Sequence, residues 1–186
     1  PVPPSVYKAW ANPPGPGVGH QNSLGNEQHQ IWPSQIGYPD PIVYQIKLQV
    51  NTHDFTSSQV LPINSSGLPT TSTDAAGNSY PAGTVRSLPS STIYGFNGTF
   101  PGPRINAEYG KPALVRFENH LDENPLGLDR QDFGAPDWSF LTHLHNGHTA
   151  PESDGNPNYS MNYGPRDHGY KPGMWVDNLY LNWPAG

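Results

Sequence analysis

The sequence contains no cysteine, and this absence excludes several kinds of site. Disulfides, thiolate zinc sites and iron–sulfur clusters all need cysteine sulfur, so none of them forms within this chain. A blue-copper centre within the chain is excluded for the same reason, because its ligands include a cysteine thiolate. Any metal that this chain binds is therefore held by nitrogen and oxygen ligands.

Charged residues and long apolar runs are also scarce. Only 13% of the residues are charged, the net charge is −6, and the nine Lys and Arg are scattered along the chain. Nucleic-acid binding needs a basic patch, so we expect no nucleic-acid partner. No apolar run approaches the roughly 20 residues that a membrane-spanning helix needs, so we expect no membrane partner either. An apolar leader segment is missing too, and we expect any signal peptide to have been removed.

Long amphipathic helices are not predicted, because helix-forming residues are sparse and 23 prolines interrupt most of the sequence. The 20 glycines and 23 prolines without a period are also typical of disorder, but the ten Tyr, six Phe and five Trp are not. Short strands joined by many turns fit this composition best. The sequence therefore predicts an all-β domain of the sandwich or Greek-key barrel type, with long loops.

Residues 1–41 are rich in Pro, Gly, Asn and Gln and are predicted to form an irregular N-terminal arm, and residues 42–186 one β domain. Residues 62–83 are predicted to be a polar, turn-rich loop. Alternating apolar residues or short aromatic runs predict five strands. These lie in IVYQIKLQV (42–50), STIYGFNGTFPGPRI (91–105), PALVRFENHL (112–121), WSFLTHLHN (138–146) and MWVDNLYLNW (174–183).

Three of the eight histidines fall within FLTHLHNGHTAPESDGNP, residues 140–157. His143 and His145 are two residues apart on a predicted strand, so both rings should leave the same face, roughly 6–7 Å apart. Imidazole binds Zn, Cu, Fe and Ni, and such a pair can hold one ion or give one ring to each of two ions. The alternative is that one or both are surface or core histidines without a metal.

The flanking sequence resembles the first cupredoxin domain of a multicopper oxidase, most closely the group of spore-coat laccase, phenoxazinone synthase and bilirubin oxidase. The family has a strand ending in N-G-x-x-P-G-P, then a strand with spaced I, G, N and L, then H-x-H-G. The matching residues are Asn97, Gly98, Pro101, Gly102 and Pro103, then Ile105, Gly110, Asn119 and Leu121, then His143, His145 and the SDG of residues 153–155. The ordered array covers about residues 42–186.

This resemblance implies a cupredoxin-like Greek-key fold and a role for each histidine of the pair. His143 would bind the type 2 copper, and His145 one type 3 copper, of a trinuclear cluster that reduces O2 to water. Asp154 matches an acid near this cluster and would relay protons; the alternative is a plain turn residue before Gly155. His120 and His168 are interpreted as structural.

Two residues near the pair depart from the family pattern. Asn146 stands where the family has glycine, and asparagine tolerates the positive φ that such a glycine supplies. His148 has no counterpart among the family's ligands, so its role stays open between a residue near the metal, a residue on the substrate side and an exposed histidine.

The chain ends shortly before the family would present its second H-x-H motif, and it lacks the blue-copper site. The resemblance therefore implies a companion polypeptide that carries the remaining cupredoxin domains; the chain is then a fragment or a subunit of a two-chain enzyme. Implied electron donors are phenols, aromatic amines, bilirubin-like compounds or metal ions. Two alternatives are a stand-alone copper- or zinc-binding module without turnover, and a relative that kept the fold and lost its metals.

Three N-x-S/T sequons, at Asn64, Asn97 and Asn158, permit glycosylation in a secreted protein. A chain this rich in Asn, Ser and Thr would carry a few such sequons by chance. The sequons therefore favour an extracellular location without establishing it.

Overall fold

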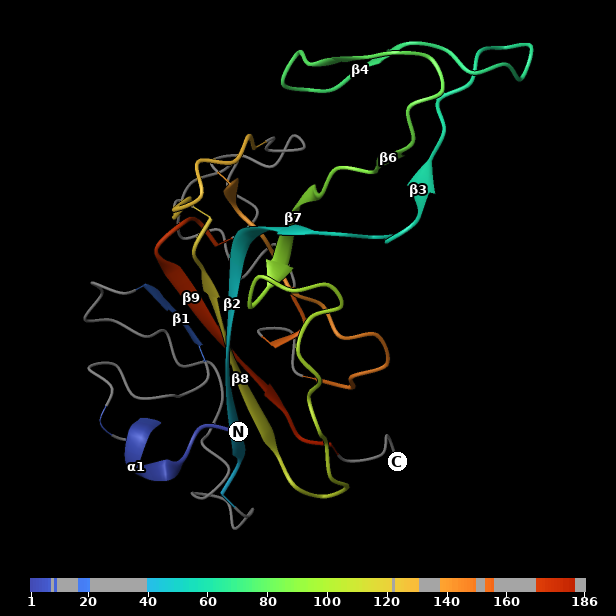
Figure 1. Ribbon diagram of the computed structural model, residues 1–186. Helices are drawn as coiled ribbons and strands as arrows, with labels where there is room; N and C mark the ends of the chain where they lie inside the picture. Colours follow the sequence, from blue (N-terminus) through green and yellow to red (C-terminus); the bar gives the residue numbers. More distant parts are fainter. Residues whose placement is uncertain are drawn as a thin grey trace. The chain divides into compact units, whose positions relative to one another are not determined.

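The computed structural model describes residues 1–7, 9, 17–20, 40–121, 123–130, 138–149, 153–155 and 170–182 (Figure 1). It contains one short helix and nine strands in these ranges. They are α1 (Pro4–Tyr7), β1 (Gly17–His20), β2 (Ile42–His53), β3 (Gln59–Val60), β4 (Ser72–Thr73), β5 (Ser79–Tyr80), β6 (Arg86–Ser87), β7 (Ser91–Phe96), β8 (Ala113–Asn119) and β9 (Met174–Tyr180). Among the described residues, no helix has the length and apolarity to cross a membrane.

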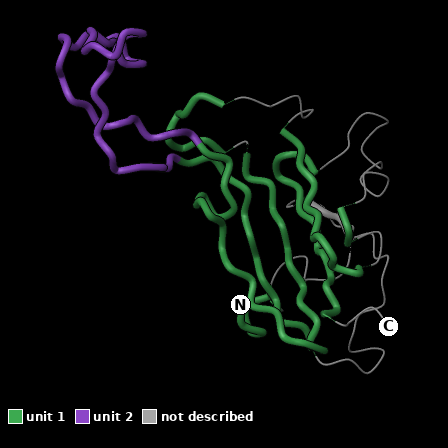
Figure 2. The backbone as a smooth tube through the Cα atoms, turned by 90° about the vertical axis from the view of Figure 1, so that its right-hand side faces the viewer, with its two compact units in different colours: residues 1–51, 93–186 green, residues 52–92 purple. Residues whose placement is uncertain are grey.

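The chain divides into two compact units, residues 1–51 with 93–186 and residues 52–92 (Figure 2). The first unit is built on a five-stranded sheet with the strand order β1-β9-β8-β2-β7. β2 pairs with β8 in parallel, from Ile42 opposite Ala113 to Leu48 opposite Asn119. β9 runs antiparallel to both β8 and β1. In Figure 1, β8 and β9 lie side by side along the middle of this sheet.

Both faces of this sheet carry apolar side chains, because every residue of β8 and β9 is buried. Successive side chains of a strand point to opposite faces, so alternate residues of β8 and β9 belong to different clusters. The larger cluster holds Tyr44, Ile46, Ala113, Val115, Phe117, Tyr170, Met174, Val176 and Tyr180. The smaller one holds Tyr7, Val43, Leu114 and Leu179. Tyr7 of α1 therefore covers part of the second face.

A buried ion pair fixes the register of the two central strands. Arg116 of β8 lies directly opposite Asp177 of β9. The Nε and Nη2 atoms of Arg116 donate hydrogen bonds of 2.8 and 2.9 Å to the two carboxylate oxygens of Asp177. The Arg116 guanidinium also stacks on the Trp175 ring, 3.7 Å from its centroid. A shift of one residue would separate these two opposite charges inside the buried sheet.

The turn after β7 is connected to β2 by hydrogen bonds. Asn97 has a φ of 55°, and its backbone N–H donates to the Lys47 carbonyl over 2.6 Å. Its side-chain oxygen accepts a hydrogen bond of 2.9 Å from the Lys47 N–H. Gly98 follows with a φ of 67° and lies close to Gln49, where a Cβ atom would meet the amide nitrogen. The N-G step of the family pattern is thus a turn that needs left-handed backbone geometry.

The second unit consists of two small hairpins. β3 pairs with β6 and β4 pairs with β5, each over two residues and antiparallel. All of residues 52–92 are described and none of them is buried. Asp74 accepts hydrogen bonds from the Asn78 backbone and side chain and from the Tyr80 hydroxyl, which hold the β4–β5 turn. Backbone and polar side-chain hydrogen bonds, rather than an apolar core, order this unit.

The predicted all-β class is confirmed, and the arrangement is consistent with a cupredoxin-like β-sandwich. The strands predicted at 42–50, 112–121 and 174–183 correspond to β2, β8 and β9. The prediction of a strand at 138–146 is wrong, because the only β-pairing of these residues is a single bridge between Phe140 and Tyr170. In the arm predicted to be irregular, residues 1–41, the structure places α1 and β1, and β1 joins the sheet beside β9.

Candidate metal centre

The segment that carries the histidines is held by one backbone bridge and by side-chain hydrogen bonds rather than by a strand ladder. Phe140 exchanges backbone hydrogen bonds of 2.8 and 3.2 Å with Tyr170, and residues 141–144 continue without regular structure. Asn119, fully buried at the end of β8, donates from its amide to the carbonyls of Trp138 and Tyr170, over 2.8 and 2.7 Å. Asn119 thus fixes both chain segments that enter the site.

The structure brings His143 and His145 together. Both residues are exposed, and their ring centroids are 4.9 Å apart with an interplanar angle of 74°. Two imidazoles at this separation lie within reach of a single metal ion or of two neighbouring ions. The expected proximity is therefore present, although it arises in a loop and not on one face of a strand.

The orientation of the His143 ring follows from one hydrogen bond. Its Nδ1 atom lies 2.7 Å from the backbone carbonyl oxygen of Asp154. A carbonyl oxygen only accepts hydrogen bonds, so Nδ1 carries the proton and donates it. The Nε2 atom of a neutral ring then has a lone pair for a metal. This donor set fits a copper ion, because a metal-binding histidine characteristically donates its other N–H to a carbonyl or carboxylate.

The SDG sequence of residues 153–155 builds the acceptor for His143. Ser153 is almost fully buried, and its hydroxyl oxygen accepts a 3.0 Å hydrogen bond from the Leu179 N–H of β9. Gly155 has a φ of 75°, and a Cβ atom there would overlap the Thr142 carbonyl oxygen. Asp154, between them, places its carboxylate 3.3 Å from His143 Nδ1 and 3.3 Å from the Thr149 hydroxyl. The loop therefore approaches the backbone next to His143 closely.

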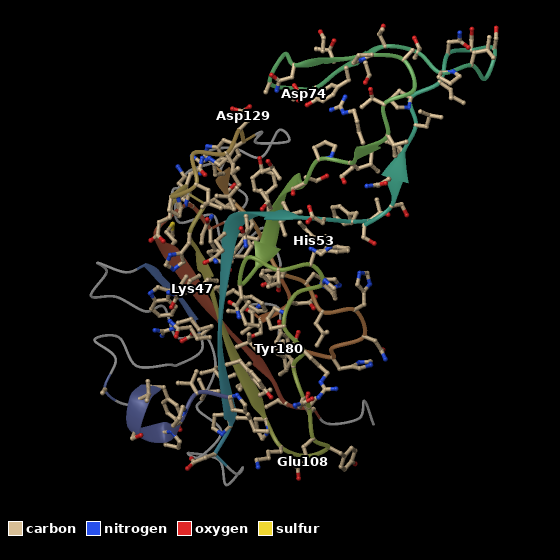
Figure 3. All side chains as sticks on the ribbon, in the orientation of Figure 1. Lys47, His53, Asp74, Glu108, Asp129 and Tyr180 are labelled. Carbon is tan, nitrogen blue, oxygen red and sulfur yellow. The ribbon has the colours of Figure 1, made fainter. Side chains whose placement is uncertain are left out.

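A second buried link joins β9 to the histidine segment. The Asn178 amide donates to the Thr142 hydroxyl over 3.0 Å and to the Tyr180 hydroxyl over 3.2 Å. Figure 3 labels Tyr180, whose side chain is buried near the end of β9. Burial raises the pKa of the Tyr180 hydroxyl above its ordinary value, the Asn178 hydrogen bond opposes this, and the Asp154 charge adds to it. Tyr180 is therefore a neutral phenol at physiological pH.

His143 also lines an apolar pocket of about 500 Å³. The pocket is an extension of the larger apolar cluster, since Ile46, Ala113, Phe117 and Tyr180 belong to both. The exposed Ala107 lies at its edge. One side of the histidine pair therefore borders an apolar surface, and the other side faces solvent.

The turn after His145 has the backbone geometry that the sequence predicts. Asn146 has a φ of 58°, which confirms the left-handed backbone expected at this asparagine. His148 has a φ of 47°, and its Nε2 atom lies 2.9 Å from the Asn146 side-chain oxygen. His148 is thus exposed and contacts its own turn.

The other candidate residues have structural surroundings or lie outside the described residues. His120 is buried between Glu118 and Glu123, with nitrogen–oxygen distances of 2.8 and 2.9 Å. His168 and Asn158 fall outside the described residues. Within the described part of the chain, no three His, Cys, Asp or Glu side chains are grouped as a metal site.

Sequence comparisons relate part of the chain to known proteins. The family model for "Multicopper oxidase" matches residues 79–128. Residues 79–128 are thus similar to part of a multicopper oxidase domain. Among its relatives, a laccase of Haloferax volcanii is 35% identical over 82 residues, which covers 37% of this chain and 14% of the relative. A laccase of Bacillus subtilis is 33% identical over 79 residues, covering 39% and 15%.

A plant relative extends the same pattern. Multicopper oxidase LPR1 homolog 1 of Oryza sativa subsp. japonica is 36% identical over 84 residues, which covers 38% of this chain and 14% of the relative. The matches therefore span about one seventh of the length of each relative. No solved structure matches the chain significantly. The multicopper oxidase family implies copper and oxidoreductase chemistry, and the family-model match ends before the histidine pair.

Two residues of the site, Thr142 and Asn178, were not predicted from the sequence, and Ser153 was matched only as part of the SDG of residues 153–155, without a role. Asn178 did carry a signal, because Asp177 and Asn178 interrupt an otherwise apolar strand. Polar residues in a buried strand need hydrogen-bond partners, and here Asn178 finds one beside His143. For Thr142 the sequence contains no comparable signal, since threonine is common throughout the chain.

Proposed function

We propose that this chain is the N-terminal part of a laccase-like multicopper oxidase and that His143 and His145 bind copper of a trinuclear cluster. The observation that carries the proposal is the pair of exposed rings, 4.9 Å apart, of which His143 is oriented through Nδ1. In this proposal His143 binds the type 2 copper and His145 one type 3 copper. Bound copper would supply one-electron chemistry and reduction of O2 to water.

Asp154 is proposed as a proton relay. Its carboxylate lies 3.3 Å from His143 Nδ1, and its side chain keeps 42% of its exposure to solvent. A carboxylate in this position can take a proton from water on its open side and pass it toward the centre. The backbone carbonyl of Asp154 orients the His143 ring, so orientation and proton transfer are carried out by different atoms of this residue.

The remaining copper ligands are proposed to come from a companion polypeptide. This polypeptide would carry the other cupredoxin domains, including the blue-copper site, for which the present chain has no cysteine. The apolar pocket beside His143 supports the idea, because a companion that covers it would bring its own ligands close to the pair. The reducing substrates proposed for the assembled enzyme are phenols, aromatic amines, bilirubin-like compounds or metal ions.

An extracellular location is proposed on weaker grounds. Of the three sequons, Asn64 and Asn97 lie on exposed residues of the described structure. The Asn64 side-chain oxygen accepts backbone hydrogen bonds within its own turn, and that of Asn97 accepts one from Lys47 of β2. Treatment of the natural protein with an amidase specific for N-linked glycans, followed by mass measurement, tests whether either site is glycosylated.

The proposal is tested by single substitutions in the copper-loaded protein. We expect His143→Ala and His145→Ala each to lower the copper content, because each removes a ligand. His143→Ala should also alter the electron paramagnetic resonance spectrum of type 2 copper, because it removes a ligand of that ion. His148→Ala is the matched control: it removes an equally exposed imidazole of the same loop and should leave both measurements unchanged.

Full copper content in both His143→Ala and His145→Ala would contradict the proposal. Binding of one copper or zinc ion per chain without oxidase activity would favour the alternative of a stand-alone metal-binding module.

A further inference from the structure

The histidine loop has a property that the metal site alone does not explain. Residues 141–144 lie outside the sheet ladder, and His143 is exposed, yet its ring has a defined hydrogen-bond partner. Exposed side chains in loops usually sample several rotamers, so another part of the structure has to fix this geometry.

We propose that Ser153, Thr142 and Asn178 are positioning residues that hold the His143 ring in its Nδ1–H tautomer, with Nε2 available to a metal. The metal in this inference is copper and rests on the proposed function, whereas the tautomer does not depend on any metal. All three residues are buried, with at most 9% of their surface exposed to solvent.

The first step concerns the acceptor side of the His143 hydrogen bond. The Ser153 hydroxyl accepts from the Leu179 N–H over 3.0 Å and ties the loop to β9 immediately before Asp154. Gly155, immediately after Asp154, lies so close to the Thr142 carbonyl that a side chain would not fit. The Asp154 carbonyl is therefore fixed on both sides.

The second step concerns the donor side. The Asn178 amide donates to the Thr142 hydroxyl over 3.0 Å, and Thr142 directly precedes His143. Asn178 and Leu179 are neighbours on β9, so the two ends of the His143–Asp154 hydrogen bond are attached to adjacent residues of one strand. β9 is fully buried and pairs with β8, which makes it a rigid support.

The chemistry of buried polar groups explains why these contacts persist. If Ser153 moved away, the Leu179 N–H would be buried without the hydroxyl that accepts its hydrogen bond. If Thr142 moved away, the buried Asn178 amide would lose its hydrogen bond to the Thr142 hydroxyl. A free imidazole in water favours the Nε2–H tautomer, which would present its protonated nitrogen to the metal. The buried contacts therefore select the tautomer that can bind.

The test uses the natural protein with any polypeptide that copurifies, labelled with ¹⁵N-histidine and stripped of metal. Long-range ¹H–¹⁵N correlation spectra at a pH where the rings are neutral report the tautomer of each histidine. We expect His143 to be mainly in the Nδ1–H form. In Ser153→Ala and Thr142→Val it should shift to mainly Nε2–H, and Cu²⁺ affinity should fall about 10- to 100-fold.

Two control variants separate positioning from general stability. Thr142→Ser keeps the hydroxyl that Thr142→Val removes, so His143 should stay in the Nδ1–H form. If Ser153→Ala does not fold, the comparison of Thr142→Val with Thr142→Ser still tests the inference. Val43→Ala lies in the smaller cluster on the other sheet face, and it should lower stability without changing the tautomer.

The inference is overturned if His143 is Nε2–H in the natural protein, or if Thr142→Val keeps the Nδ1–H form. A protein that shows the expected tautomers and yet binds no copper would retain the positioning inference and disprove the proposed function.

Discussion

At the scale of single residues, the site depends on close approach between backbone segments. Gly155 and Gly67 both have a positive φ, of 75° and 76°. A Cβ atom at Gly155 would overlap the Thr142 carbonyl oxygen, whereas at Gly67 it would meet nothing within 4 Å. The two glycines therefore separate the cost of backbone conformation from the cost of a steric overlap.

We expect Gly67→Ala to lower the free energy of unfolding by about 1 kcal/mol, the usual cost of left-handed backbone for alanine. Gly155→Ala should cost at least about 1–3 kcal/mol more, because the loop has to move away from Thr142. Urea denaturation of the two variants measures the difference. Equal losses would show that the loop does not approach Thr142 as described.

Asp74 provides a residue whose ionisation stabilises its turn. Hydrogen bonds from the Asn78 side chain and backbone, and then from Tyr80, lower the pKa of Asp74 from 3.8 to about 2. Because the pKa is lower in the folded turn, its stabilisation is fully present above about pH 4 and is lost as the pH falls through about 2. We expect the Asn78 amide to lose its protection against hydrogen exchange, relative to the intrinsic exchange rate, only in this acidic range.

Asp74→Ala is the control for this pH dependence. It removes the acceptor, so the Asn78 amide should lack protection at every pH, while the amides of β8 remain protected. A natural protein whose Asn78 amide loses protection already near neutral pH would contradict the assignment to Asp74.

At the scale of strands, the sequence predicted the sheet better than the loops. Alternation in β2, and the apolar residues of β8 and β9, identified these strands because burial of their side chains dominates their structure. WSFLTHLHN has a similar pattern, yet Asn119 and the Phe140–Tyr170 bridge hold it outside the sheet. Such long-range contacts have no signal in the local sequence.

In the candidate site, too, the local features were predicted from the sequence and the long-range contacts were not. The spacing of His143 and His145 predicted their proximity, and asparagine at residue 146 predicted a positive φ, which is a local property. The contacts from Ser153 and Asn178 could not be predicted, because they join residues that are 26 and 36 positions apart in the sequence.

The ion pair between β8 and β9 gives a prediction at this scale. Asp177→Ala should lower the free energy of unfolding by about 3–5 kcal/mol, because it leaves the Arg116 charge buried without its partner. The double substitution Arg116→Met with Asp177→Leu should recover most of this loss, since neither charge remains. Chemical denaturation of the three proteins measures both effects. A double variant as unstable as Asp177→Ala would contradict this explanation.

At the scale of the whole molecule, the matched segments cover only about one seventh of each relative. The described chain offers two clustered imidazoles, and the exposed Ala107 lines the apolar pocket beside His143. If a companion covers this pocket, Ala107→Arg should weaken the association, because it places a charge against an apolar contact. Ala75→Arg, in an exposed turn of the second unit, is the control. Unchanged association of Ala107→Arg in size-exclusion chromatography would exclude this surface from the interface.

The proposed enzyme is a copper oxidase in which this chain is assembled with another polypeptide. Native mass spectrometry of the purified protein, followed by denaturation of the same sample, tests it most directly. We predict a complex that contains copper for a trinuclear cluster and a blue-copper site, and that releases a 20.3 kDa chain and a larger companion. A single 20.3 kDa species without copper would contradict the account.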